Sequence, residues 1–200
     1  MKILGLDVSS ASTGWAVLED GQLLSESDCG FIQMRQKTHG ERLNYFEQQL
    51  KSIIAKHQVE MIAIEDVWAG KFIQPALILS RYRGVAEKVC WEHFKCEPLV
   101  RTATDFRKLV GLKHGTNLLP GKKEKVQTGL DSKMLTFQLM KRVFNLTGFD
   151  FAKHNDATDA LCVALGAHLI GTDLGKAADA ETAAKKAAKK EKAKSAKKRK

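Results

Sequence analysis

Residues 2–17, KILGLDVSSASTGWAV, decide the fold that the rest of the chain has to complete. A short apolar run ends on Asp7, a Ser-rich turn follows, and a second apolar run begins at Gly14, which predicts strand, turn and strand. A nearly continuous apolar strand is usually buried on both faces, so Asp7 at its end either meets water or occupies a site that holds it. The simpler interpretation is that Asp7 only hydrogen-bonds the turn at Ser9 and Ser10.

The next segments predict two more elements that pack on this strand pair. Asp20-Gly21 is a strong hairpin signal between residues 15–19 and 22–27, so we expect three antiparallel strands in a row. Residues 38–57 place apolar side chains at helical spacing and predict an amphipathic helix that packs by one face.

Residues 59–67, VEMIAIEDV, form a second nearly unbroken apolar strand that also closes on acidic residues. A strand reached through a helical crossover is normally parallel to the strand that it joins, so Asp7 and the end of this strand should meet at one edge of the sheet. Because successive side chains point to opposite faces, only one of Glu65 and Asp66 can face Asp7. We expect Glu65 to be the one that does.

The following segments predict the remainder of an α/β domain. Thr104 or Asp105 could cap a short helix. We expect a helix over 71–94, a short fifth strand at 99–100, the capped helix ending near 111, a mobile basic loop over 113–132 and a helix over 133–144.

The last ordered element begins HNDATDALCVALGAHL at His154 and predicts a helix with Asn155 as its N-cap. Asp156 and Asp159 are three residues apart, so both lie on one side of the first helical turn. A structural explanation also exists, since the helix macrodipole favours acidic residues near an N-terminus.

Together these segments bring four carboxylates toward one place. Such a group of anions repels strongly unless cations share the site. Hard oxygen ligands without a His/Cys cluster indicate Mg²⁺ or Mn²⁺, and two such ions about 3.5–4 Å apart support phosphodiester hydrolysis. The pattern therefore predicts a metal-dependent nuclease with these acids: Asp7, Glu65, Asp156 and Asp159.

Four segments resemble RuvC-type Holliday junction resolvases of the RNase H-like superfamily: LGLDVSSASTGWAV, IAIEDVW, RGVAEKV and HNDATDALCVALGAH, spread across residues 3–168. The resemblance implies an α/β fold with a five-stranded mixed sheet, three antiparallel strands followed by parallel strands, and helices on both faces. It also implies a homodimer that nicks two strands of a four-way DNA junction symmetrically. The catalytic and metal-binding acids would be the four carboxylates above, with two Mg²⁺ ions per active site, for which Mn²⁺ could substitute.

The resemblance leaves some roles open. His154 is either a metal ligand or proton carrier, or a solvated residue at the helix start. The family's active-site lysine aligns more naturally with Lys133 than with Lys123. The chain also departs from the family pattern: Val8-Ser9 stands where many bacterial members have Pro-Gly, the loop over 113–132 is long and the basic tail is additional, and together these differences indicate a divergent, phage-encoded member.

Several residues are expected to contact DNA. Trp68 lies three residues beyond Glu65, where RuvC-type enzymes carry an aromatic wedge that stacks on an unpaired base. Its alternative role is to cover the hydrophobic core. The basic residues expected to contact DNA are Arg107, Lys122, Lys123 and Lys125.

Composition divides the chain into one domain and a tail. The 200 residues are 44% hydrophobic, enough for a single good-sized core, which we assign to residues 1–175. Residues 176–200 hold eleven Lys and Arg against three acids, so this Lys/Ala-rich segment carries +8 of the net +10. We expect it to be disordered. The four cysteines lack metal-site spacing, and no secretion signal or membrane span is evident, so we expect a cytoplasmic protein of a bacterium or phage-infected cell.

Other functions remain to be weighed against junction resolution. The turn after Asp7 also resembles the first phosphate loop of actin-like and sugar-kinase ATPases, but that architecture needs a second domain for which 175 residues leave little room. Nearer alternatives are RNase H-like nucleases that act on RNA–DNA hybrids, flaps or other branched DNA. The expected partner is branched DNA, four-way junctions above all, and no membrane.

Overall fold

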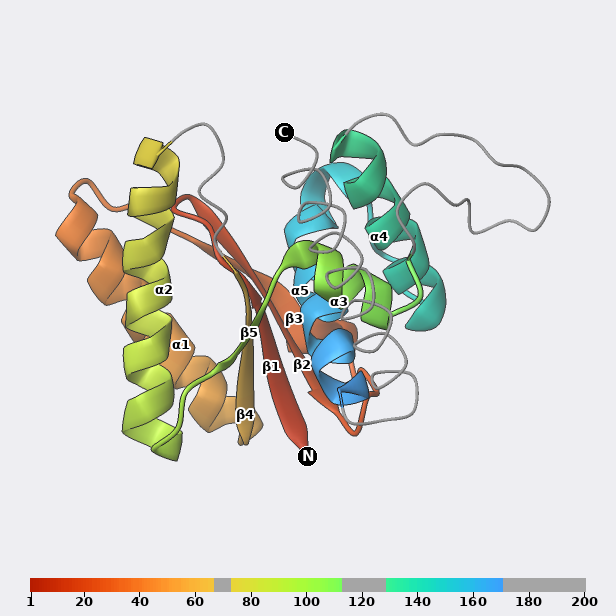
Figure 1. The fold of residues 1–200 in the computed structure, drawn as a ribbon, viewed down its shortest axis with the longest axis horizontal. Helices are drawn as coiled ribbons and strands as arrows, with labels where there is room; N and C mark the ends of the chain where they lie inside the picture. Colours follow the sequence, from red (N-terminus) through yellow and green to blue (C-terminus); the bar gives the residue numbers. More distant parts are fainter. Residues whose placement is uncertain (67–72, 113–128, 171–200) are drawn as a thin grey trace, which may run out of the picture.

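The computed structural model describes residues 1–66, 73–112 and 129–170, which form one five-stranded mixed sheet between two helical layers (Figure 1). The strand order is β3-β2-β1-β4-β5. The β1 strand pairs antiparallel with β2 and parallel with β4, while β2–β3 is antiparallel and β4–β5 parallel. The predicted fold class is thereby confirmed. The strands are β1 (Lys2–Asp7), β2 (Ser12–Glu19), β3 (Cys29–Gln33), β4 (Met61–Glu65) and β5 (Leu99–Arg101).

The helices divide between the two faces of the sheet. Figure 1 shows α1 and α2 on one face and α3, α4 and α5 on the other. Their bounds are α1 (His39–His57), α2 (Ile73–Phe94), α3 (Ala103–Leu109), α4 (Gly129–Val143) and α5 (Phe151–Leu169), with a short 3₁₀ helix η1 (Glu26–Asp28) before β3.

Large apolar side chains fill the layer beneath α1 and α2. Leu4 and Leu6 of β1 point to this face, as do alternate residues of β4, because side chains alternate along a strand. The helix α1 begins where the sequence predicts, since Thr38 and Glu41 form a reciprocal capping box. The fully buried residues that the helices contribute include Phe46, Leu50, Tyr82 and Val89.

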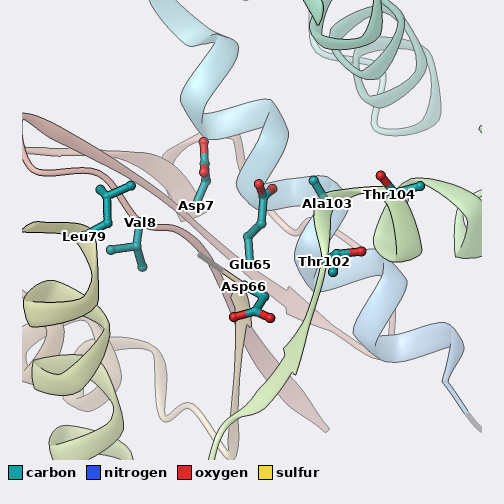
Figure 2. Close-up of a pocket in the computed structure, with 8 residues that line it drawn as sticks. All are labelled: Asp7, Val8, Glu65, Asp66, Leu79, Thr102, Ala103 and Thr104. Carbon is teal, nitrogen blue, oxygen red and sulfur yellow. The ribbon is translucent and has the colours of Figure 1, made fainter. Parts of the chain in front are cut away.

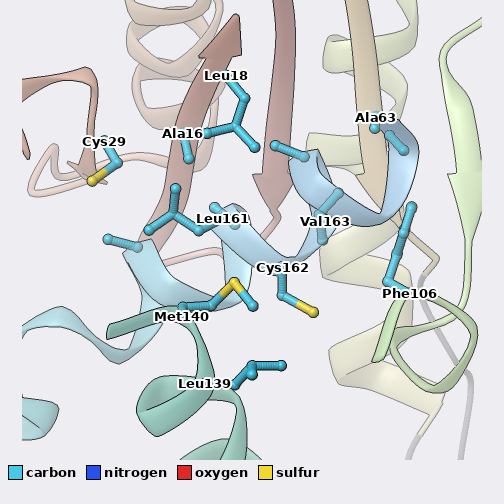
Figure 3. Packing of buried hydrophobic residues seen from close by; sticks show 14 of the residues in the cluster. Ala16, Leu18, Cys29, Ala63, Phe106, Leu139, Met140, Leu161, Cys162 and Val163 are labelled. Atoms are coloured by element: carbon cyan, nitrogen blue, oxygen red, sulfur yellow. The ribbon is translucent and has the colours of Figure 1, made fainter. Parts of the chain in front are cut away.

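In the other layer α5 comes very close to β1 and β2 at two glycines, while large buried side chains such as Leu18, Phe106 and Met140 fill the space around this contact. A Cβ on Gly5 would come within 2.4 Å of the Ala160 carbonyl oxygen, and one on Gly14 within 2.0 Å of the Asp156 carbonyl oxygen. Residues 157–164 of α5 are all buried, with the sheet on one side and α3 and α4 on the other. Figure 3 shows how side chains of α5 such as Leu161 and Cys162 fill the space between Ala16 of β2 and Met140 of α4.

The third strand differs from its prediction. The Asp20-Gly21 turn forms, with positive φ at both residues, but pairing stops at the single bridge between Glu19 and Gln22. The Ser25 hydroxyl then accepts a bond from the Ser27 backbone N–H and caps η1. Local side-chain bonds of this kind compete with strand pairing. The predicted strand over 22–27 is therefore wrong, and the third strand is Cys29–Gln33.

Two helix starts also differ from the prediction. Thr102, rather than Thr104 or Asp105, caps α3, because its hydroxyl accepts from the Asp105 backbone N–H at 3.2 Å. Asp150, rather than Asn155, caps α5 and accepts from the Ala152 backbone N–H at 2.8 Å. The earlier start places Asn155 inside the helix.

Other predictions fall on segments beyond the described part. Residues 113–128 of the predicted basic loop lie outside it, and so do the tail and residues 67–72, which include Trp68. Residues 129–132, expected in the loop, belong instead to the first turn of α4. Within the described residues, no helix is long and apolar enough to cross a membrane. The four cysteines are free thiols: Cys29, Cys90 and Cys162 are buried and Cys96 is exposed.

Candidate functional site

Asp7 and Glu65 end two neighbouring parallel strands. Leu6 pairs with Ile64, so the next residue of each strand, Asp7 and Glu65, lies at the same edge of the sheet. Figure 2 shows both carboxylates on the α5 side, whereas Asp66 points away from them. Asp66 forms an ion pair with Arg83 of α2. Alternation along β4 thus separates the roles of two adjacent acids, as expected from the sequence.

Asp156 and Asp159 reach this edge from α5. The side chain of Asp159 is buried, with 4% of its surface exposed, and its charge acts on both Asp7 and Glu65. The close contact between the Asp156 backbone and Gly14 of β2 holds the first part of α5 against the strands. The structure therefore brings together carboxylates that are more than 150 residues apart in the chain.

Two cations face the buried carboxylate of Asp159, one at each oxygen. The Lys133 Nζ atom lies 3.3 Å from Oδ2, and the Arg107 Nη2 atom lies 3.6 Å from Oδ1. Arg107 also donates from Nε to the hydroxyl of Thr136, at 3.0 Å. Three helices, α3, α4 and α5, therefore meet through this one carboxylate.

The acids perturb one another's protonation. Burial, followed by the charges of Glu65 and Asp159, raises the pKa of Asp7 to about 8, against the opposing effect of Lys133. Burial and then Asp159 raise the pKa of Glu65, while Arg107 and Lys133 oppose the shift. Burial also raises the pKa of Asp159 despite its two cationic partners. Lys133 and Arg107 thus do not fully offset the cost of ionising these buried carboxylates together.

The carboxylates of this site have the donor atoms and the charge that a divalent cation requires. Carboxylate oxygens are the ligands that Mg²⁺ and Mn²⁺ prefer, and a cation would offset the cost of burying the ionised carboxylates as well as the repulsion between them. In the structure the side chains of the acids are not gathered around one point. Within residues 1–66, 73–112 and 129–170, no three His, Cys, Asp or Glu side chains surround a common point. Asp159 is instead engaged by Lys133 and Arg107.

A cleft of about 630 Å³ opens beside Asp7 and Glu65 (Figure 2). It lies between α2 and the start of α3, across the ends of β1, β4 and β5. The acids are thus reached from the surface rather than sealed in the core. The residues that line the cleft are Asp7, Val8, Glu65, Asp66, Leu79, Thr102, Ala103 and Thr104.

The other predicted site residues have varied positions. His154 stacks on Phe149, with ring centroids 4.5 Å apart, and its Nδ1 atom lies 3.1 Å from both the backbone nitrogen and the carbonyl oxygen of Asp150, so it takes part in the start of α5. Arg107, predicted to contact DNA, lies against Asp159. Trp68, Lys122, Lys123 and Lys125 lie outside the described residues.

Thr136 is the residue of this region that sequence reasoning missed. Its side chain is fully buried and bridges Arg107 to the backbone of α4. The available signal was its position three residues after Lys133 in a helix, which places both side chains on one face.

Comparisons with known proteins agree with this architecture. A model of the family described as "Crossover junction endodeoxyribonuclease RuvC" matches residues 3–110. The RuvC of Citrifermentans bemidjiense is 33% identical over 175 residues, covering 86% of this chain and 94% of the relative. A shorter match to RuvC of Oleidesulfovibrio alaskensis, 32% identical over 92 residues, covers 46% of this chain and 55% of the relative.

A solved structure shows the same fold at low sequence identity. The structure of "T. thermophilus RuvC in complex with Holliday junction substrate" matches with a TM-score of 0.64 and 13% identity, covering 86% of this chain and 95% of that one. The sheet topology, the acids at its edge and the extent of the matches lead to one assignment. The chain belongs to the RuvC family of crossover junction endodeoxyribonucleases.

Proposed function

We propose that the protein is a metal-dependent endonuclease that resolves four-way DNA junctions by paired phosphodiester hydrolysis. The observation that carries this proposal is the convergence of Asp7, Glu65 and Asp159 at one sheet edge in a chain of the RuvC family. Recombination, repair and metal dependence are typical of that family.

The metal would be Mg²⁺, with Mn²⁺ as a substitute, and two ions would be held by Asp7, Glu65, Asp156 and Asp159. When bound, the ions activate a water molecule and stabilise the leaving oxygen of the phosphodiester. Asp7 and Glu65, at the ends of adjacent strands, and Asp156 and Asp159, on one helix, would supply the oxygen ligands for these ions. Lys133, half exposed beside Asp159, is positioned to neutralise a phosphate oxygen that enters the site.

The homodimer supplies the second cut. The group of acids around Asp7 would cut one phosphodiester at a time, so symmetric nicking of two strands requires the same site of a second copy of the chain. Light scattering should give twice the monomer mass at micromolar concentration, and a monomeric mass with full junction cleavage would contradict this part of the proposal. Such a protein would act in the cytoplasm, where the DNA of a bacterium or an infecting phage is found.

Trp68 would open the junction. It follows Glu65 by three residues and would stack on a base at the crossover, an interaction of about 1–3 kcal/mol per base. Trp68→Ala should lose junction distortion, measured with a fluorescent base analogue, at an unchanged melting temperature. A destabilised variant that still opens the junction would assign Trp68 to the core instead.

The basic loop and tail would bind phosphates without regard to sequence. Lys122, Lys123 and Lys125 would act near the junction, whereas residues 176–200 would be a basic tail attached to a domain over residues 1–175. Deleting the tail should weaken binding to all DNA and reduce the dependence of affinity on salt, because fewer counterions are released. An unchanged salt dependence would show that the tail does not contact DNA.

Substrate choice tests the main proposal. The full-length protein is incubated with Mg²⁺ and labelled four-way junction, linear duplex, flap or RNA–DNA hybrid, with EDTA and the Asp7→Asn variant as controls. We expect paired nicks near the crossover and little cleavage of the other substrates. Preferred cleavage of the hybrid or flap would replace junction resolution by a different RNase H-like nuclease activity.

A further inference from the structure

The hydroxyl of Thr136 has both of its hydrogen-bonding functions committed. The side chain is fully buried, donates to the Ser132 carbonyl oxygen at 2.9 Å and accepts from Arg107 Nε at 3.0 Å. Because the hydroxyl proton points to the Ser132 carbonyl oxygen, a lone pair of the hydroxyl oxygen faces Arg107. A buried hydroxyl held in this way has one orientation, and so does the group that donates to it.

Arg107 is consequently held in one orientation, whereas Lys133 is not. The Nε bond orients the planar guanidinium, and Nη2 then faces Asp159 Oδ1 at 3.6 Å. Lys133 reaches the other oxygen of Asp159 with a side chain that is 46% exposed, and a flexible ammonium can turn toward solvent or a phosphate. The two cations on Asp159 therefore differ: one is fixed within the fold and the other can leave.

A fixed cation at a metal-binding carboxylate must affect metal binding. Arg107 acts on Asp159 and also on Glu65, so its charge is felt by two of the four acids. An ion that approaches these carboxylates meets the repulsion of a guanidinium that cannot withdraw while Thr136 holds it.

We propose that Thr136 is a positioning residue that holds Arg107 on Asp159, so that the guanidinium competes with divalent metal and sets the metal concentration at which the site fills. This inference rests on the proposed function only in taking a divalent cation as the ligand of the acids. It requires no particular DNA substrate. A purely structural Thr136 would instead stabilise the packing of α3 on α4 and leave metal affinity unchanged.

The test measures Mn²⁺ binding to the full-length protein without DNA, by electron paramagnetic resonance of the free ion. The variants are Thr136→Val, which keeps the shape and removes the hydroxyl, Thr136→Ser, which restores it, and Arg107→Met, which removes the charge. Thr158→Val is the matched control, because this buried hydroxyl also donates to a carbonyl oxygen of its own helix, that of Asn155, whereas Arg107 donates to Thr136. Melting curves confirm that each variant is folded.

We expect Arg107→Met and Thr136→Val to bind Mn²⁺ about fivefold to tenfold more tightly, because a repelling charge is removed or released. Thr136→Ser and Thr158→Val should stay within about twofold of the parent protein. Unchanged or weaker binding by Thr136→Val overturns the inference, as does a parent protein that binds no Mn²⁺ at millimolar concentration. If Thr136→Val fails to fold, the Mn²⁺ affinities of Arg107→Met and Arg107→Lys are compared instead to test whether Arg107 competes with the metal.

The outcome is independent of the substrate assay. A protein that cuts flaps or hybrids instead of junctions, yet shows tighter Mn²⁺ binding in Thr136→Val, would contradict the proposed function and support this inference. Junction cleavage without any change in Mn²⁺ affinity among the variants would do the reverse.

Discussion

The two faces of the sheet both carry a hydrophobic core, but they differ in how closely a helix backbone approaches the strands. Beneath α1 and α2, large side chains such as Phe46 and Tyr82 separate helix from strand and make an ordinary hydrophobic core. Beneath α5, Gly5 and Gly14 have no side chain, and the helix backbone rests on the strands. The acids lie on the closely packed face. The comparison shows that the acids lie on the face where the helix backbone contacts the strands directly.

The largest effect should separate two adjacent acids that point to opposite faces. Glu65→Gln should reduce junction cleavage at least about 100-fold, because a neutral amide would replace the anionic carboxylate proposed to bind metal. Asp66→Asn, the matched control, breaks an ion pair with Arg83 and should change the rate by no more than about threefold. Cleavage kinetics at saturating Mg²⁺ measure both. Similar losses in the two variants would remove the distinction between the faces.

A second pair of variants compares the two layers directly. Gly14→Ala should lower the free energy of unfolding by about 1–3 kcal/mol or more, since the new Cβ would meet the Asp156 carbonyl oxygen. Phe46→Ala, in the other layer, should cost about 3–5 kcal/mol. Urea unfolding gives the stabilities, and active-site titration gives the rate per folded molecule. We expect that rate to fall only in Gly14→Ala, and an equal fall in Phe46→Ala would show that both layers position the acids.

The pH dependence of stability should also report on the acid face. The pKa of Asp7 is raised to about 8 from 3.8, so between these values the folded state keeps a proton that the unfolded state has lost. Metal-free protein should therefore lose stability as pH rises through this range, and its melting temperature should fall by about 5 °C between pH 5 and 8. Added Mg²⁺ should restore more at pH 8 than at pH 5. A flat profile, or one that Asp7→Asn does not alter, would contradict the pKa assignment.

The smallest effect concerns the outer surface of α1 and α2. Glu47 forms ion pairs with Lys51 at 2.6 Å and with Lys88 of the neighbouring helix at 2.7 Å. These groups are solvated, so Glu47→Gln should lower the melting temperature by less than about 3 °C and leave cleavage unchanged. Differential scanning calorimetry at low and high salt measures this. A loss of cleavage would mean that this layer also influences the acids.

The part of the fold that could be predicted followed from local patterns. Strands that end on acids, and side chains that alternate, were enough to place Asp7 and Glu65 at one edge. The third strand was misplaced because a correct turn signal at Asp20-Gly21 says nothing about how far pairing continues. The caps of α3 and α5 were misplaced because several capping residue types stood close together, and only the folded backbone selects among them.

The part of the site that escaped prediction depends on tertiary contact. The sequence does not distinguish Arg107 from the other basic residues expected to contact DNA. Nothing near it in the chain indicates that α3 will place its side chain beside Asp159. Thr136 likewise acquires its partner only when α3 and α4 both pack on α5 and bring Arg107 to the hydroxyl. Residues defined by a neighbour from another helix cannot be found from spacing along one element.

The position of α5 at the end of the described chain also orders the events of synthesis. The first 112 residues contain all five strands and the α1 and α2 layer, but the sheet face at Gly5 and Gly14 stays uncovered until residue 169 has left the ribosome. Domains form as units during synthesis, with contacts to late segments made last. A growing chain therefore holds Asp7 and Glu65 before Asp159 is in place, and the group of acids is complete only once this last described helix has formed.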